Sequence, residues 1–336
     1  MAKCTLSVEI ENPREQYVPG DVIDVIVHVE TTDSVKCSAL TLEFGWETHG
    51  TGNCDSDEFE TQTLFDGQWS PGDELGYRAQ VTVPRFSQAR PASYHGRHIN
   101  VDWHLRARAD IPWAFDPKAE ARIFLAPDAG TVPPYERPSL WPTEPVKLAG
   151  NSGCLIVLTV IAFVAGGFLV MHKPWIGAAC FAGGLFAAIF TWKENELRKR
   201  IGDVGFGFAP DRPAIGGELH AFAEIAPPGR LDIESVTMTL AAEEVAVSGS
   251  GTQRTTHRHK AFEQAVVQAE HQTVSAGDTL ELDFSFELPV DLPPSFEGDD
   301  NSIEWTLDLD VKAMGAKELT ATKELTVGHV IRPRTG

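Results

Sequence analysis

Two pairs of histidines come closest to a pattern that could do chemistry. His257 and His259 are separated by one residue, so on a strand both imidazole rings would face the same side, as a metal site requires. They follow the turn-like segment 248–251, and no carboxylate or cysteine beside them completes a zinc-binding set. A solvated hairpin is therefore the competing interpretation. His95 and His98 precede an alternating run and leave the same two interpretations open.

The other motifs that carry chemistry are incomplete or absent. Residues 54–58 (Cys-Asp-Ser-Asp-Glu) are acidic, but a calcium loop also needs an internal glycine and a spaced distal glutamate. The sequence contains no Gly-x-Ser-x-Gly, no Gly-x-x-x-x-Gly-Lys-Ser/Thr and no His-Glu-x-x-His. We therefore expect no catalytic residue, no metal and no cofactor. A metal-dependent enzyme stays as a third interpretation of the function, and it depends on the histidines alone.

The overall charge excludes a general nucleic-acid binder. The 336 residues include 28 Lys and Arg and 48 Asp and Glu, which gives a formal net charge of −20. Binding to nucleic acid needs cations that displace counterions from phosphates. The five cysteines are an odd number, and the N-terminus lacks the apolar core of a cleaved export signal. Both features favour a reducing compartment over a disulfide framework.

Two uncharged apolar segments in the middle of the chain predict a membrane hairpin. Residues 153–171 and 175–192 would form helices roughly 28 and 27 Å long, which fit a hydrocarbon core about 30 Å thick. Only His172, Lys173 and Pro174 separate them, and the proline favours a reversal. The competing interpretations are a buried hairpin in a protein without spans and a re-entrant hairpin in one leaflet.

Flanking and small residues support two spans within 151–192. Trp175 and Trp192 bracket the second segment, where an aromatic belt would lie. Small residues would let the two helices pack closely, namely Gly166, Gly167, Gly183 and Gly184. Cations follow the second span directly, namely Lys193, Arg198, Lys199 and Arg200. The positive-inside rule then places both flanking halves in the cytoplasm.

Both halves show the pattern of β-sandwich strands, which is alternation of apolar residues broken by Gly, Pro and Asp. Residues 99–105 alternate around Trp103, and residues 303–307 alternate around Trp305, which lies 202 positions later. Turns and strands recur in the same order with a similar offset throughout. The pattern predicts a tandem repeat of one sandwich, with each tryptophan as a buried core anchor.

Several stretches resemble the arrestin fold family. Residues 277–289 (GDTLELDFSFELP), residues 292–298 (LPPSFEG) and residues 303–305 follow the family's order, and residues 17–23 match its opening. The family includes arrestins, the retromer subunit similar to them and bacterial sporulation-control proteins. The resemblance implies immunoglobulin-like sandwiches that bind other proteins, without shared catalytic residues. The identity of the partner does not transfer, because the family has a short linker where this chain has apolar segments.

We therefore expect an all-β chain with two tandem arrestin-like β-sandwich domains separated by a two-helix transmembrane hairpin. The expected boundaries are 1–127 for the first sandwich, 128–150 for a proline-rich linker, 151–192 for the hairpin, 193–201 for a basic linker and 202–333 for the second sandwich.

The expected function is a non-catalytic, membrane-anchored adaptor or scaffold that binds protein partners at the cytoplasmic face of a bilayer. The expected localisation is a two-span membrane protein with both sandwiches cytoplasmic. The expected partners are proteins and the lipid bilayer, without nucleic acid. The alternative is a regulatory or structural subunit of a membrane complex, assembled or oligomerised through the hairpin.

Overall fold

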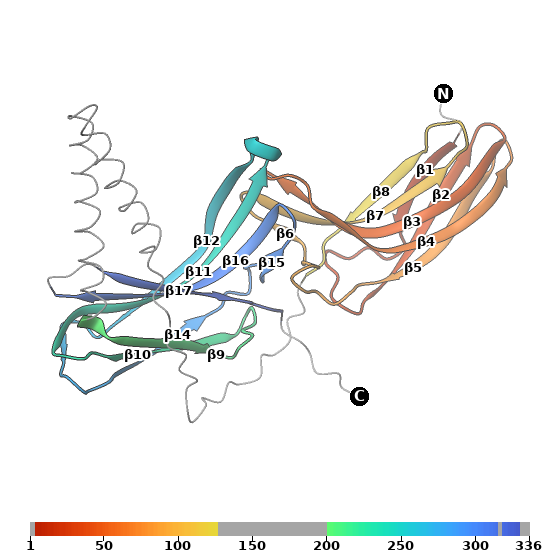
Figure 1. Cartoon of the computed structure of the whole chain (residues 1–336). Helices are drawn as coiled ribbons and strands as arrows, with labels where there is room; N and C mark the ends of the chain where they lie inside the picture. Colours follow the sequence, from red (N-terminus) through yellow and green to blue (C-terminus); the bar gives the residue numbers. More distant parts are fainter. Residues whose placement is uncertain (1–3, 127–199, 315–317, 330–336) are drawn as a thin grey trace, which may run out of the picture.

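The computed structural model describes residues 4–126, 200–314 and 318–329, which form two β-sandwich domains (Figure 1). The strands described in the first domain are β1 (Cys4–Ile10), β2 (Val22–Thr31), β3 (Val35–Gly50), β4 (Ser56–Trp69), β5 (Glu74–Thr82), β6 (Tyr94–His95), β7 (Ile99–Asp110) and β8 (Lys118–Ile123). Those of the second are β9 (Asp203–Ala209), β10 (Glu218–Ala226), β11 (Leu231–Ser248), β12 (Thr255–Gln268), β13 (Gln272–Val274), β14 (Leu280–Glu287), β15 (Phe296–Glu297), β16 (Asn301–Ala313) and β17 (Leu319–Leu325), with a 3-10 turn η1 (Gly251–Gln253).

Each domain is built from two antiparallel sheets of the same kind. In the first domain, β1-β2-β5 faces β4-β3-β7-β6, and β8 pairs with β7. In the second, β14-β10-β9 faces β12-β11-β16-β15, with β13 on β11 and β17 on β16. The strand orders correspond one to one, apart from the added β13.

Alternation along the strands dictates which face of each sheet is buried. In β2, Ile23, Val25, Val27 and Val29 are at most 1% exposed, and more exposed residues stand between them. Successive side chains of a strand point to opposite faces, so an apolar residue at every second position fills one core. In β16 the same alternation runs from Asn301 to Ala313.

Matching hydrogen bonds show that the two domains share one plan. The indole N–H of Trp103 donates to the carbonyl of Pro91 at 2.9 Å, and that of Trp305 donates to Pro293 at 3.2 Å. Both tryptophans lie in their cores, 0% and 1% exposed. Ser93 Oγ likewise accepts the backbone amide of Leu125, and Ser295 Oγ of the second domain accepts that of Val327, in each case 32 residues further along the chain. These paired contacts are what a tandem repeat requires.

The expected membrane architecture needs correction. No helix among the described residues is long and apolar enough to cross a bilayer. The described fold is all-β, and its apolar side chains are buried between sheets. The transmembrane-hairpin architecture and the two-span cytoplasmic localisation were therefore wrong as a description of this structure. They rested on the hydropathy of two segments and on their flanking tryptophans and cations, which record local composition and not what covers a segment in the fold. The segment 151–192 itself lies outside the described residues.

Candidate functional site at the domain junction

The two domains meet through the turns at their facing ends (Figure 1). The turns between β3 and β4 and between β6 and β7 belong to the first domain, and those between β11 and β12 and between β15 and β16 belong to the second. The long strands β3 and β11 carry the side chains that reach across. In Figure 1 the tip of β11 and β12 lies beside the loop that joins β3 to β4.

One contact across the junction is made by the carboxylate of Glu244 on β11, which is 1% exposed. It accepts the backbone amides of Arg97, His98 and Ile99 in the β6–β7 turn, at 3.1, 2.6 and 3.3 Å. The hydroxyl of Tyr94 donates to the same carboxylate at 2.7 Å. Burying a carboxylate costs free energy, because the charge loses its hydration. Hydrogen-bond donors such as these replace the lost water and offset that cost. We call this contact the Glu244 clasp.

A second contact runs in the opposite direction, from the first domain to the second. Asp55, which precedes β4, accepts the backbone amides of Asp300 at 3.1 Å and Asn301 at 2.9 Å in the β15–β16 turn. The amide group of Asn301 also donates to Asp55 at 2.8 Å and to the carbonyl of Asn53 at 2.7 Å. We call this contact the Asp55 clasp. Each domain thus presents a carboxylate to equivalent backbone amides of the other.

The Glu244 clasp stabilises the charged form of its carboxylate. Burial on its own raises the pKa of Glu244, but the hydrogen bonds from His98, Tyr94 and the neighbouring amides outweigh it and hold the pKa below its usual value. Burial and the same carboxylate raise the pKa of Tyr94, so its phenol stays protonated and donates. The clasp therefore holds an anion at neutral pH, matched by donors without an opposite charge.

Aromatic contacts add to the clasps. Trp46 of the first domain meets Phe296 of the second edge to face, with ring centroids 5.5 Å apart. Phe86 of the first domain packs on His329 of the second at 4.9 Å. Edge-to-face aromatic pairs contribute about 0.5–1.5 kcal/mol beyond their area. These contacts and the clasps join the two domains.

Three of the four candidate histidines, His98, His257 and His259, come together at the same junction, whereas His95 pairs with Asp102. The ring of His98 lies 6.0 Å from that of His257 and 5.9 Å from that of His259, centroid to centroid. Thr51 Oγ1 lies 3.0 Å from His98 Nδ1, and Ser248 Oγ lies 3.0 Å from His257 Nε2. Within the described ranges, however, no group of three or more His, Cys, Asp or Glu side chains is placed to hold a metal ion.

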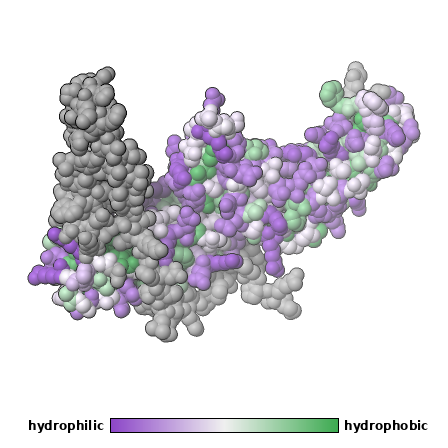
Figure 2. Space-filling model, in the orientation of Figure 1, coloured by the Kyte–Doolittle hydropathy of each residue, from purple (hydrophilic) through white to green (hydrophobic). Residues whose placement is uncertain are grey.

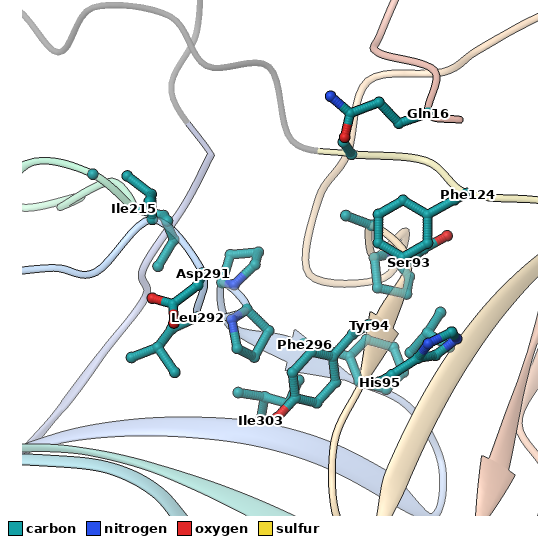
Figure 3. A pocket seen from close by; sticks show the side chains of 18 residues that line it. Gln16, Ser93, Tyr94, His95, Phe124, Ile215, Asp291, Leu292, Phe296 and Ile303 are labelled. Atoms are coloured by element: carbon teal, nitrogen blue, oxygen red, sulfur yellow. The ribbon is translucent and has the colours of Figure 1, made fainter. Parts of the chain in front are cut away.

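A hollow of about 610 Å³ opens between the domains beside the clasps (Figure 3). Figure 3 shows Tyr94 and Phe124 of the first domain on one side and Ile215 and Leu292 of the second on the other. Most of its lining is apolar, and two lining side chains are well exposed, Phe124 at 40% and Val290 at 77%. The volume is in the range of pockets that hold small molecules or a few side chains.

Three polar side chains at the hollow, those of Ser93, His95 and Tyr94, are engaged with neighbours. Ser93 Oγ accepts the backbone amide of Leu125 at 2.9 Å, and His95 Nε2 lies 2.9 Å from Asp102 Oδ1. The hydroxyl of Tyr94 is turned away to Glu244. A nucleophile that is hydrogen-bonded to a base would be needed for acyl transfer. The arrangement is suited to burying apolar groups, and it does not place such a pair in the hollow.

The residues predicted to lie at a membrane are largely outside the described part. Arg200 is described and exposed, immediately before buried Ile201. The other interface and packing residues fall in the undescribed range 127–199, namely Trp175, Trp192, Lys193, Arg198, Lys199, Gly166, Gly167, Gly183 and Gly184.

Two residues of the junction were missed from the sequence. Asp55 was considered only as part of an acidic loop, and Glu244 stands beside Glu243 in a strand, where one acidic residue looks like another. The repeat contains one feature that points to these contacts. Gly96 and Gly298 occupy matching places, and a Cβ on either would collide with the opposing carboxylate.

Comparisons with known proteins show no family for this chain. No protein-family model matches the sequence, and no curated protein is significantly similar to it. Among solved structures, the chain is similar to the sporulation control protein Spo0M of Bacillus subtilis, with 10% sequence identity and a TM-score of 0.31. The match covers 96% of this chain and 91% of that one. A TM-score this low does not establish a shared placement of the domains, so the function proposed below is built on contacts within this chain.

Proposed function

We propose that the chain is a non-catalytic binding protein, an adaptor or scaffold that holds a protein partner at the hollow between its two domains. The observation that carries the proposal is that residues of both domains line one apolar hollow beside the two clasps. A partner that binds there contacts both domains at once. The resemblance of residues 277–298 to the arrestin family supports the same class of function, because members of that family bind proteins.

The chemistry of the hollow favours apolar side chains of a protein as its occupant. Removing apolar surface from water contributes roughly 25 cal/mol per Å², and the lining offers aromatic rings, aliphatic chains and prolines. Two of the apolar lining side chains, Val290 and Phe124, are also exposed to solvent. An apolar surface with polar surroundings is typical of a protein contact. The net charge of −20 argues against nucleic acid.

Crosslinking from the rim tests the proposal. A benzoylphenylalanine placed at position 290 should crosslink to a partner protein in the native cell. The same group at position 267 is the control, because Val267 is 48% exposed on β12 and does not line the hollow. The captured partner should then bind purified Val290→Glu protein at least tenfold more weakly than wild type, and Val267→Glu protein equally well. Equal crosslinking from both positions, or a partner indifferent to Val290→Glu, would contradict the proposal.

A further inference from the structure

The turn between β7 and β8 displays two aromatic side chains entirely to solvent. Trp113 is 102% exposed and Phe115 is 101% exposed, relative to the reference for each residue. Single exposed apolar residues are ordinary on a protein surface, but two large rings on one turn form a concentrated apolar projection. Figure 2 shows hydrophilic residues over much of the visible face of both domains, with smaller hydrophobic patches between them.

The turn holds these rings in a defined conformation. The amide of Ala114 donates to the carbonyl of Ile111 at 3.2 Å, which closes a β-turn with Pro112 in second place. Trp113, in third place, has φ of 64°, as in a type II turn, where glycine is normally required. Bulky residues rarely adopt this conformation, and such strain gathers at functional positions.

Polar contacts below the rings fix the turn to the sheet. Arg108 donates to Asp116 through two nitrogens, at 2.6 and 3.1 Å. Asp116 also accepts the amide of Ile111 at 3.2 Å, and Ile111 packs against the core of the domain. The backbone that carries the rings is therefore tied to the sheet by hydrogen bonds, and such ordering before binding lowers the entropy that binding costs.

The hollow of the same chain has the properties that this projection needs in a partner. It is apolar, it is lined by rings and prolines, and its 610 Å³ is enough for an indole and a phenyl ring. Asp291 is exposed on its lining, and Lys118 is exposed beside the turn, so their charges are complementary. The two features cannot meet within one chain. β7 begins at the junction and ends at Asp110, so the turn lies roughly 35 Å from the junction at about 3.3 Å per residue.

We infer that Trp113 and Phe115 of one chain insert into the hollow of a second copy, with Lys118 facing Asp291. The inference rests on the proposed function, because it names one occupant of the same hollow. The contact is head to tail: each copy offers a projection and a hollow, so the copies form open chains unless the geometry closes a ring. Two aromatic side chains bury about 150–250 Å² each. The interface is therefore below the roughly 1,200 Å² of stable complexes, and association is weak and reversible.

Sedimentation velocity of the full chain over a series of concentrations tests the inference. Wild type should sediment faster as concentration rises. Trp113→Gly removes the indole and supplies the residue that the turn conformation favours, so it should stay monomeric while its thermal midpoint is unchanged or higher. Val290→Glu should also stay monomeric. Val267→Glu, an exposed change away from the hollow, should associate like wild type.

Mixing the two monomeric variants is the decisive step. Trp113→Gly protein keeps an intact hollow, and Val290→Glu protein keeps an intact projection. A mixture should therefore form dimers and nothing larger, because each pair has only one working contact. Wild type that is monomeric at every concentration, or variants that fail to complement, would overturn the inference. The proposed function is tested separately by the crosslinking experiment. Crosslinking of another protein from position 290 would support the proposed function even if the chain does not self-associate. Failure of both experiments would contradict both the self-association and the proposed function.

Discussion

Glu244 and Gly96, which belong to different domains, are packed so closely that the glycine has no room for a side chain. A Cβ on Gly96 would collide with Oε1 of Glu244, and a Cβ on Gly298 would lie 2.5 Å from Oδ2 of Asp55. Gly298 stands 202 positions after Gly96, the same offset that separates the two core tryptophans. The repeat therefore supplies a bare backbone turn twice, and the opposing domain supplies a carboxylate to each.

Removing the charge of Glu244 should weaken the junction. Glu244→Gln leaves the three backbone amides of the β6–β7 turn facing a poorer acceptor at a buried position, so we expect a loss of about 2–4 kcal/mol in the free energy of unfolding. Urea denaturation of the full chain measures it. Glu243→Gln is the matched control. Glu243 is partly exposed and pairs with exposed Arg258 at 2.6 Å, so its loss should cost below about 1 kcal/mol. Equal effects of the two changes would mean that the clasp contributes no stability.

A methyl group on either junction glycine should push the opposing carboxylate away from the turn amides that it accepts. Gly96→Ala and Gly298→Ala should each destabilise the chain by about 1–3 kcal/mol, because overpacking forces the neighbouring groups to move. Gly229→Ala is the control, since nothing lies within 4 Å of its added Cβ. Limited proteolysis should cut the two junction variants faster than the control. Junction variants as resistant as Gly229→Ala would show that the turns accommodate a side chain.

Acid should destabilise the junction through His329. Burial lowers the pKa of His329 to about 4, and both ring nitrogens are buried without a hydrogen-bond partner among the described residues. In the unfolded chain the pKa is about 6.5, so the unfolded state binds more protons between these values. The free energy of unfolding should therefore fall as pH drops from about 6.5 to 4, by about 3 kcal/mol in total from this residue.

The variant His329→Leu isolates that effect. It should be more stable than wild type at pH 7, because two unsatisfied buried nitrogens are removed and the contact with Phe86 is kept apolar. It should also lack the extra loss of stability between about pH 6.5 and 4. Urea midpoints of both proteins across this range provide the measurement. Parallel pH profiles would show that His329 does not titrate differently in the folded chain.

Truncating Trp305 should damage the second core. Trp305→Ala should lower the free energy of unfolding by about 3–5 kcal/mol, because a large buried ring leaves a cavity. Trp305→Phe keeps much of the volume but loses the hydrogen bond to Pro293, so it should cost less. Thermal unfolding by circular dichroism ranks the variants. An alanine variant as stable as the phenylalanine variant would contradict the core role.

The sequence by itself determined the strands and their repetition. Alternation around Trp103 and Trp305 specifies a buried face, because side chains of a strand point to opposite sides in turn. Turn glycines at matching positions then specify the order of strands. These are local properties, written into neighbouring residues. Apolar composition and flanking residues led to a membrane architecture that the described fold does not contain, and the segment that suggested it, 151–192, lies outside the described residues.

Only the tertiary structure decided how the two domains meet. Glu244 and His98 are 146 residues apart, and Asp55 and Asn301 are 246 apart, so no pattern within one strand records either contact. The sequence around an acidic strand residue does not distinguish one that faces water from one that accepts three backbone amides. The cost of burying its charge is met by donors from the other domain. The hollow follows from the same docking, because residues of two separate sandwiches line it.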